Sequence, residues 1–299
     1  MSLQNNDVRS ELATLIESGA VSQAQVAREC GISAALVSQF LNDKYTGDND
    51  KVARDLAAFI VRFKAASDQP VKNLPFVPTS VYKAVTEVAQ TCHASGIIGL
   101  VVGASGLGKT RSIEEYAANN PGVILIRAHA KYSVKDVFSD IHIEVGFDGK
   151  GNVHRMMRDI EVKLKGTKRL IVIDEAEHLT ANTLDEIRQI NDRVGVGILY
   201  IGLEKFRSQL RTMRTGFEYI VNRVRIPRKL EKLQLADVEK LVSTVLPNAN
   251  GLCKVFHEMS GGNARVLETI LFNSFRVSSI KKCEINAELI KQVALAVIV

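Results

Sequence analysis

The stretch GASGLGKT, residues 103 to 110, decides the fold of this chain. It fits the pattern GxxxxGKT, follows the apolar run IIGLVV at 97–102, and precedes the helix-like stretch RSIEEYAANN. A glycine-rich loop between a buried strand and a helix turns backbone N–H groups toward an anion at the start of the helix. The sequence therefore predicts a phosphate-binding loop inside an α/β fold.

Three further apolar runs have the length of strands, and helical patterns separate them: VILIR at 123–127, LIVI at 170–173 and ILYI at 198–201. Continuous apolar strands of this kind are typical of a parallel sheet that is covered on both faces. One connecting segment places apolar residues at helical spacing, and its methionines are expected in the core: Val153, Met156, Met157, Ile160 and Leu164.

The loop and the residue after it are expected to contact a nucleotide: Gly103, Ala104, Ser105, Gly106, Leu107, Gly108, Lys109, Thr110 and Arg111. Lys109 supplies a positive charge for the β and γ phosphates, and the Thr110 hydroxyl is suited to Mg²⁺.

A second motif, LIVIDEAEHL at 170–179, delivers Asp174 to the carboxyl end of a strand, where ligands bind in open α/β sheets. We expect Asp174 to hold Mg²⁺ and Glu175 to polarise a water for attack on the γ phosphate. The two motifs together predict an ATPase that uses ATP and Mg²⁺.

Composition along the chain predicts four parts. Helical periodicity marks residues 1–66, and the stretch 67–80 holds three of the six prolines and is expected to be a linker. Residues 81–233 carry the strands and the two motifs of the ATPase core. Residues 234–299 show only helical patterns and are expected to form a helical lid domain.

Within residues 1–66 the spacing of Ala27, Gly31, Val37 and Phe40 follows the register of a helix-turn-helix. Ser33 is suited to cap the second helix. On that helix the exposed side chains that could address base edges are Gln39, Ser38 and Asn42, and no arginine is present for guanine. Two interpretations therefore stay open: weak contact with DNA through Gln39, or a structural or protein-docking role.

The net charge of +6 is unevenly distributed. Residues 1–66 hold seven cations against eight acids, whereas residues 205–232 hold nine cations against two acids. If a polyanion binds, the second stretch is the expected place, because phosphate neutralisation dominates such binding. The candidate DNA contacts are Arg155, Arg158, Arg207, Arg211 and Arg214. The alternative is that these cations belong to solvated helix faces.

Composition also argues against several classes of protein. The four cysteines lack CxxC spacing, so we expect neither a disulfide framework nor a zinc site. The longest apolar run, VALAVIV at 293–299, is far shorter than a membrane span, and the N-terminus lacks the apolar core of a signal peptide. A cytoplasmic protein without membrane contact is expected.

The DEAEHL stretch, the strand spacing and the trailing helices resemble the AAA+ ATPases. The resemblance implies an oligomer in which an arginine of one subunit reaches the neighbour's γ phosphate, and Arg223 in YIVNRVRIP (219–227) is the first candidate, with Arg225 second. In GGNARVLETI (261–270), Arg265 matches the family's second sensor. Each of these arginines could instead be a surface cation.

One position departs from the family pattern. Where the family usually has a polar side chain to orient the attacking water, ILYIGLEKF supplies Leu203. Either Glu204 takes that role or hydrolysis is slow.

The segment FLNDKYTGDNDKV (40–52), the proline-bearing linker, the two motifs and the helical C-terminal part together resemble the transposition protein B family of bacteriophage Mu and its relatives. This resemblance implies an ATPase that binds double-stranded DNA with little sequence preference and polymerises on it as a helical filament. It also implies capture of target DNA and activation of a transposase in a bacterial host cell. Two rival functions are a nucleotide-gated helix-turn-helix transcription regulator and an AAA+ ATPase that assembles a protein complex without DNA.

Overall fold

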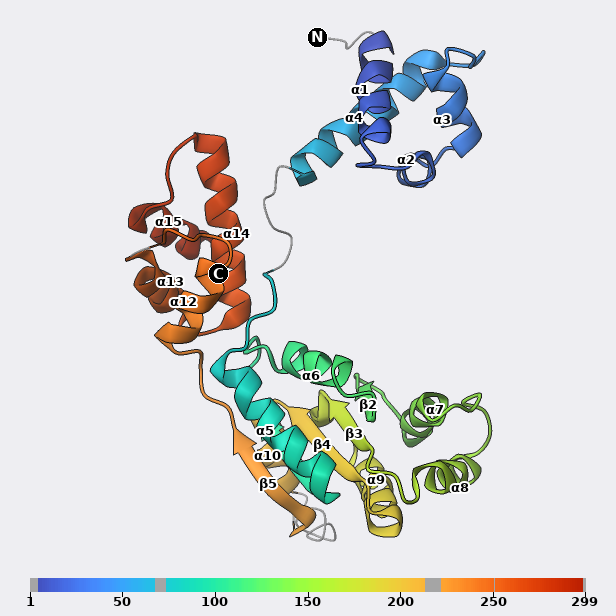
Figure 1. The fold of residues 1–299 in the computed structure, drawn as a ribbon, viewed down its shortest axis with the longest axis vertical. Helices are drawn as coiled ribbons and strands as arrows, with labels where there is room; N and C mark the ends of the chain where they lie inside the picture. The colour runs from blue at the N-terminus through green and yellow to red at the C-terminus, as the bar shows by residue number, and fades with distance from the viewer. Residues whose placement is uncertain (1–4, 68–73, 213–221, 250, 298–299) are drawn as a thin grey trace. The chain divides into compact units, whose positions relative to one another are not determined.

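The computed structural model describes residues 5–67, 74–212, 222–249 and 251–297, with side chains except at 64–67 and 211–212 (Figure 1). The chain divides into two compact units, Met1–Lys72 and Asn73–Val299. Within the described residues no helix is long and apolar enough to cross a membrane.

The first unit is helical. Its helices are α1 (Asn5–Glu17), α2 (Gln23–Cys30), α3 (Ala34–Leu41) and α4 (Asn49–Ser67). Gly31 ends α2 with a φ of 67°, and the Ser33 hydroxyl accepts a hydrogen bond from the Leu36 N–H at 3.1 Å, so the expected turn and cap are both present. Val37 and Phe40 are fully buried in this unit's own core, as their spacing predicts.

The second unit is built on a five-stranded parallel sheet in the order β2-β3-β4-β1-β5. The strands are β1 (Ile98–Val102), β2 (Val123–Arg127), β3 (Leu170–Asp174), β4 (Gly197–Gly202) and β5 (Val224–Lys229). The first four confirm the apolar runs predicted above. Strand β5 was not predicted, because it lies at the sheet edge, alternates half-buried with exposed residues, and contains Pro227.

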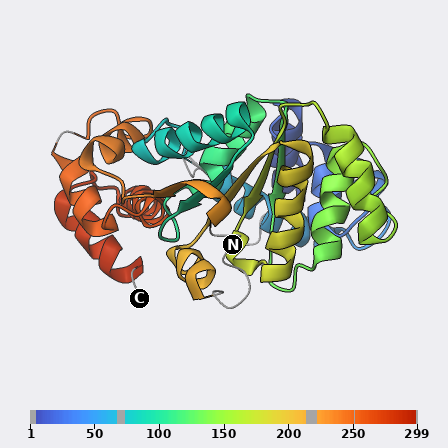
Figure 2. The ribbon, with the colours of Figure 1, turned by 90° about the horizontal axis from the view of Figure 1, so that it is seen from below.

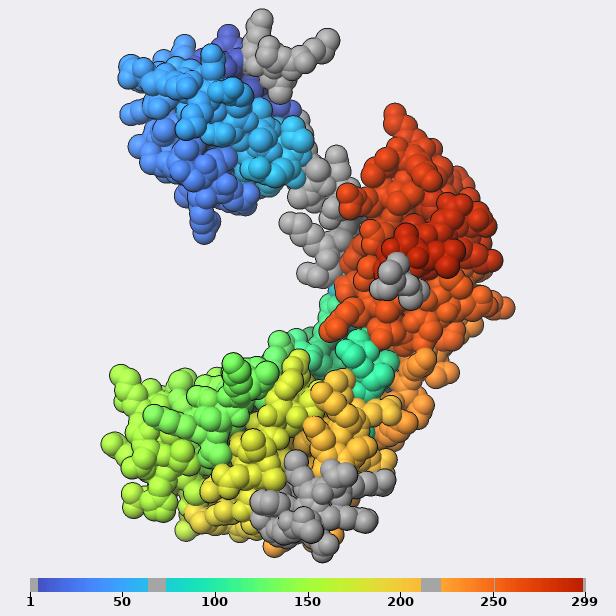
Figure 3. Space-filling model, turned by 180° about the vertical axis from the view of Figure 1, so that it is seen from behind, coloured from blue at the N-terminus to red at the C-terminus, as the bar shows by residue number. Residues whose placement is uncertain are grey.

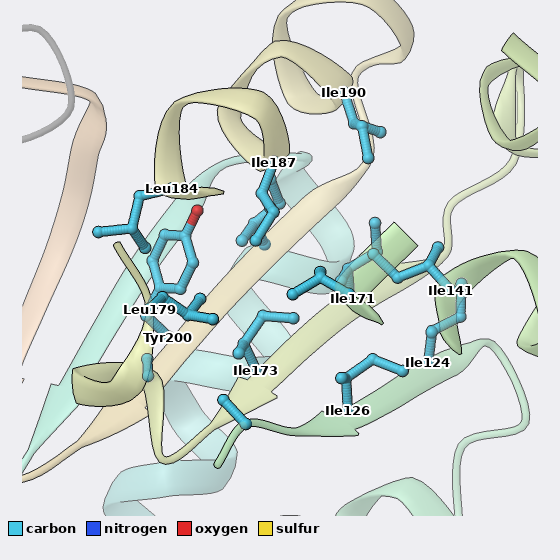
Figure 4. Close-up of a cluster of buried hydrophobic side chains, with 14 of the residues drawn as sticks. Ile124, Ile126, Ile141, Ile171, Ile173, Leu179, Leu184, Ile187, Ile190 and Tyr200 are labelled. Atoms are coloured by element: carbon cyan, nitrogen blue, oxygen red, sulfur yellow. The ribbon is translucent and has the colours of Figure 1, made fainter. Parts of the chain in front are cut away.

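Helices cover both faces of this sheet. On one face lie α5 (Ser80–Ser95) and α6 (Lys109–Ala118), and on the other α7 (Val134–Glu144), α8 (Val153–Leu164), α9 (Ala181–Val194) and α10 (Glu204–Thr212). Side chains alternate between the faces, so Ile171 and Ile173 point toward α7 and α9 (Figure 4) while Leu170 and Val172 join the α5 side. The buried Met156 and Met157 confirm the core role predicted for α8.

The chain ends in four described helices, α12 (Leu235–Ser243), α13 (Leu252–Ser260), α14 (Ala264–Lys281) and α15 (Ala287–Val297). In Figure 2 they lie at the β5 end of the sheet, and the α7–α8 pair lies at the β2 end. Phe256 and Leu267 of these helices belong to the same apolar cluster as Val101 and Val172 of the sheet. The helical domain therefore shares a core with the ATPase sheet.

Two substitutions on α8 test this packing. Ile160→Ala should destabilise the second unit by about 2 to 5 kcal/mol, because Ile160 is fully buried and the truncation leaves a cavity. Val162→Ala on the same helix should change stability by less than about 0.5 kcal/mol, because Val162 is 77% exposed. Urea unfolding followed by circular dichroism measures both. Equal effects of the two substitutions would contradict the orientation of α8.

Candidate nucleotide site

The phosphate-binding loop connects β1 to α6 at the carboxyl edge of the sheet. Gly106 and Gly108 have φ values of 77° and 90°, a region that glycine adopts without steric cost. Gly103 donates its N–H to the Gly202 carbonyl at 3.2 Å, and a Cβ there would lie 2.9 Å from the Leu230 Cβ. The glycines at 103, 106 and 108 therefore meet backbone requirements of the loop.

Lys109 is the first residue of α6 and is buried except for 9% of its surface. Its ammonium donates to the carbonyls of Gly103 at 2.9 Å and Ala104 at 2.7 Å. Burial lowers the pKa of Lys109, and the carboxylates of Asp174 and Glu177 act in the opposite direction. The charge lies inside the loop, where a phosphate would be bound.

Thr110 and Asp174 meet across the sheet edge. The Thr110 hydroxyl donates to Asp174 Oδ2 at 2.6 Å, and the Glu175 N–H donates to Asp174 Oδ1 at 3.0 Å. Burial raises the pKa of Asp174, and these two hydrogen bonds lower it. A third group near Asp174 is Arg127, the last residue of β2, which the sequence did not single out. Its Nε lies 3.7 Å from Asp174 Oδ2.

The paired oxygens of Thr110 and Asp174 fit Mg²⁺, a hard cation that protein sites bind through one or two carboxylates together with substrate phosphates and water. Among the described residues no cluster of three or more histidines, cysteines or acids could hold a metal by itself. A magnesium site in which Thr110 and Asp174 supply two oxygens and the nucleotide phosphates supply others agrees with both observations.

Glu175 follows β3 in a left-handed conformation with φ of 55°. Its side chain is half exposed, and the carboxylate lies 3.6 Å from His178 Nε2. Backbone of this kind in a non-glycine residue is uncommon and concentrates at functional sites. Glu175 lines the pocket, and its role toward the attacking water stays a prediction.

Glu177 is the second acid that lines the pocket from this turn, and the sequence did not single it out. Its side chain is buried, and Oε2 accepts a hydrogen bond from the Leu203 N–H at 3.2 Å. A Cβ on Gly202 would lie 2.6 Å from that oxygen, so the glycine leaves room for the carboxylate. Glu177 thus brings an acid to the end of β4, where Leu203 has no polar side chain. Glu204 pairs instead with Lys229 at 3.4 Å.

The pocket has a volume of about 820 Å³, which suits a nucleotide-sized ligand. One wall is the segment that leads into α5, a stretch that the sequence assigned to the linker. Leu74 donates its N–H to Glu268 Oε1 at 3.0 Å, and its carbonyl accepts a hydrogen bond from Arg111. Arg265 on α14 also lines the pocket, as expected for a group that reaches the phosphates.

Arg223 lies at the amino end of β5, opposite the carboxyl edge that holds the pocket. Its guanidinium is half exposed and lies 3.5 Å from Asp192 Oδ1. Arg225 is also exposed. Neither lines the pocket of its own chain, so any contribution of Arg223 or Arg225 to ATP chemistry would have to act on a neighbouring subunit.

The candidate DNA contacts that the structure describes fall on three helices. Arg155 and Arg158 are exposed on α8, and Arg207 is exposed on α10. Both helices pack on the same face of the sheet, and both form part of the surface of the second unit in Figure 3. Gln39 is exposed on α3 of the first unit. The side chain of Arg211 and the whole of Arg214 lie outside the described residues. In the basic stretch, Arg228 pairs with Glu87 at 2.8 Å and Lys229 pairs with Glu204, which reduces its free charge.

Comparison with known proteins agrees with this site. Residues 93–210, from the end of α5 to α10, match the family model described as an AAA domain. The chain contains an AAA domain and is an ATPase. The chain is similar in fold to the Aeropyrum pernix ORC2 protein, with a TM-score of 0.56 and 14% identity, covering 76% of this chain and 70% of that one.

Two curated relatives extend the similarity over most of the chain. The Mu-like prophage FluMu DNA transposition protein B of Haemophilus influenzae is 28% identical and covers 83% of this chain and 89% of the relative. The ATP-dependent target DNA activator B of Escherichia phage Mu is 29% identical and covers 79% and 77%. These relatives confirm the resemblance inferred from the sequence.

Substitutions of the two acids separate their roles. Glu175→Gln should slow ATP turnover by about 10²- to 10⁴-fold, as expected for loss of a general base, and leave ATP binding intact. Glu177→Ala should slow turnover more than Glu177→Gln, because only glutamine retains an acceptor for the Leu203 N–H. Steady-state phosphate release and equilibrium nucleotide binding measure both. Equal turnover in the two Glu177 variants would show that its hydrogen bond does not shape the site.

Proposed function

We propose that this AAA ATPase binds double-stranded DNA with little sequence preference, polymerises on it when ATP is bound, captures it as a transposition target and activates a transposase. The observation that carries the proposal is the pairing of Thr110 with Asp174 beside the phosphate-binding loop, in a chain whose relatives are named transposition protein B and ATP-dependent target DNA activator B. The site alone supports ATP hydrolysis. The choice of DNA and a transposase as partners comes from the names of the relatives.

Within the site each residue has a chemical task. The loop amides and Lys109 bind the β and γ phosphates, and Arg265 approaches them from α14. Glu175 accepts a proton from the attacking water, and Glu177 fixes the end of β4 beside it. Thr110 and Asp174 would hold Mg²⁺, which would supply positive charge near the phosphate oxygens.

Self-association is proposed because Arg223 and Arg225, the candidates for the arginine that meets the γ phosphate, do not line the pocket of their own chain. Arg223 or Arg225 of a neighbouring subunit would supply that charge. Arginine suits the task since it stays protonated and presents two donors to phosphate oxygens. ATP would then hold subunits together, and hydrolysis would release them.

DNA contact is assigned to the second unit on grounds of charge. Exposed Arg155, Arg158 and Arg207 offer phosphate contacts, whereas α3 offers Gln39 and two alanines, Ala34 and Ala35, on its exposed side. In the first unit Arg9 is directed inward, because its guanidinium lies 4.8 Å from the Phe40 ring centroid and pairs with Asp43 at 2.6 Å.

Binding to several unrelated duplexes of equal length, with ATP, ADP or no nucleotide, tests the proposal. The wild-type chain should bind all duplexes with ATP and lose affinity steeply as salt rises. Lys109→Ala should bind no better with ATP than without nucleotide, since the phosphates lose their main cation. Lys254→Ala, an exposed charge on α13 outside the pocket, should behave as wild type.

Other outcomes favour other functions. Strong preference for one duplex sequence would favour a nucleotide-gated transcription regulator. Absence of any binding with ATP would favour an ATPase that assembles a protein complex without DNA. If Lys109→Ala bound DNA without ATP as tightly as the wild-type chain does with ATP, the proposed coupling between ATP and DNA binding would be wrong.

Removal of residues 1–66 tests where the phosphates are held. The remaining chain should keep most of its DNA affinity, because the deleted part has a net charge of −1. The slope of log affinity against log salt should change by less than about one, the amount expected for a single phosphate contact. Complete loss of binding by a folded, ATP-binding deletion variant would place the DNA contact in the first unit.

A further inference from the structure

Asn263 joins the C-terminal helical domain to the phosphate-binding loop. It precedes α14, and its Oδ1 accepts hydrogen bonds from the N–H groups of Arg265 at 3.0 Å and Val266 at 3.2 Å. Its Nδ2 donates to the carbonyl of Ser105 at 2.8 Å, across 158 residues of chain. One amide group therefore caps a helix of the helical domain and binds the loop at the same time.

A second contact runs beside the first. The Arg265 N–H also reaches the Gly106 carbonyl at 3.1 Å. Gly106 itself leaves the space that Asn263 occupies, since a Cβ there would lie 2.4 Å from Asn263 Oδ1. The start of α14 thus binds two consecutive loop carbonyls, and the glycine of the motif permits this approach.

These contacts bear on phosphate binding through peptide geometry. A trans peptide is planar, so its carbonyl and the following N–H point in opposite directions. When α14 holds the carbonyls of Ser105 and Gly106, it also fixes the directions of the N–H groups of Gly106 and Leu107. Both residues line the nucleotide pocket, and no described hydrogen bond uses either N–H as a donor.

We propose that Asn263 is a positioning residue that couples the C-terminal helical domain to nucleotide binding by holding the Ser105 carbonyl of the loop. It does not contact phosphate. It holds the loop in the shape that presents its amides, so affinity for nucleotide depends on the position of α14, and nucleotide in turn orders the start of α14. This coupling is separate from any charge contact that the Arg265 side chain makes.

Two substitutions divide the roles of the amide. Asn263→Asp and Asn263→Ser both keep an oxygen that caps α14, and both lose the donor to Ser105. Asn152 provides the matched control, because its side chain caps α8 by accepting from the Arg155 N–H at 2.8 Å, outside the pocket. Asn152→Asp and Asn152→Ser therefore repeat the change of cap without a loop contact.

Binding of a fluorescent ADP analogue and hydrogen exchange with and without ADP are the measurements. Both Asn263 variants should bind ADP about five- to tenfold more weakly, as expected for loss of one hydrogen bond, and both Asn152 variants should bind normally. In wild type ADP should slow exchange in residues 103–110 and 261–270. In the Asn263 variants, at saturating ADP, the slowing should persist at 103–110 and largely disappear at 261–270.

Normal ADP affinity and normal protection of 261–270 in both Asn263 variants would overturn the proposal and leave Asn263 as a helix cap. Weak binding by the Asp variant alone, restored at high salt, would overturn it too, because salt screens charge repulsion and does not replace a lost donor. Thermal unfolding checks that the variants fold. If the Ser variant does not fold, the Asp variant at high salt decides the question by itself.

Discussion

The ATP site depends on one constraint, the parallel alignment of β1, β3 and β4 with their carboxyl ends at one edge. This alignment brings Thr110 and Asp174, 64 residues apart in the chain, within 2.6 Å. It also lets Gly103 bind the carbonyl of Gly202 and lets Glu177 reach the Leu203 N–H. These groups come from the carboxyl ends of three strands, β1, β3 and β4, so loss of the strand register would separate the phosphate loop from the acids beside it.

The sequence was informative wherever burial and local geometry decide the structure. Strands β1, β3 and β4 are buried along their whole length, and β2 is apolar up to Arg127, so four apolar runs mark them. The loop glycines 106 and 108 lie where φ is positive. Strand β5 escaped prediction because an edge strand that holds Pro227 and alternates in burial lacks that signal. Glu177 and Asn263 escaped prediction for another reason. Their partners, Leu203 and Ser105, lie 26 and 158 residues away, and no local pattern marks such pairs.

The structure also redistributes the charges that the sequence presented as a single basic stretch. Arg228 and Lys229 pair with Glu87 and Glu204, and Arg223 lies near Asp192. Pairs of this kind at the surface contribute little stability, but they lower the local positive potential. The exposed arginines of α8 come from a separate segment. A count of charge along the sequence therefore overstates the part that residues 205–232 play in attracting a polyanion.

The position of Leu74 has a mechanical consequence. Its N–H binds Glu268 of α14 and its carbonyl binds Arg111 of α6, so the first described residue of the second unit is held by both sides of the nucleotide pocket. The polypeptide that arrives from residues 1–72 is thus anchored at the pocket before it reaches the sheet. Tension applied to the first unit, for example by a bound macromolecule, would reach these two hydrogen bonds before it reached the sheet.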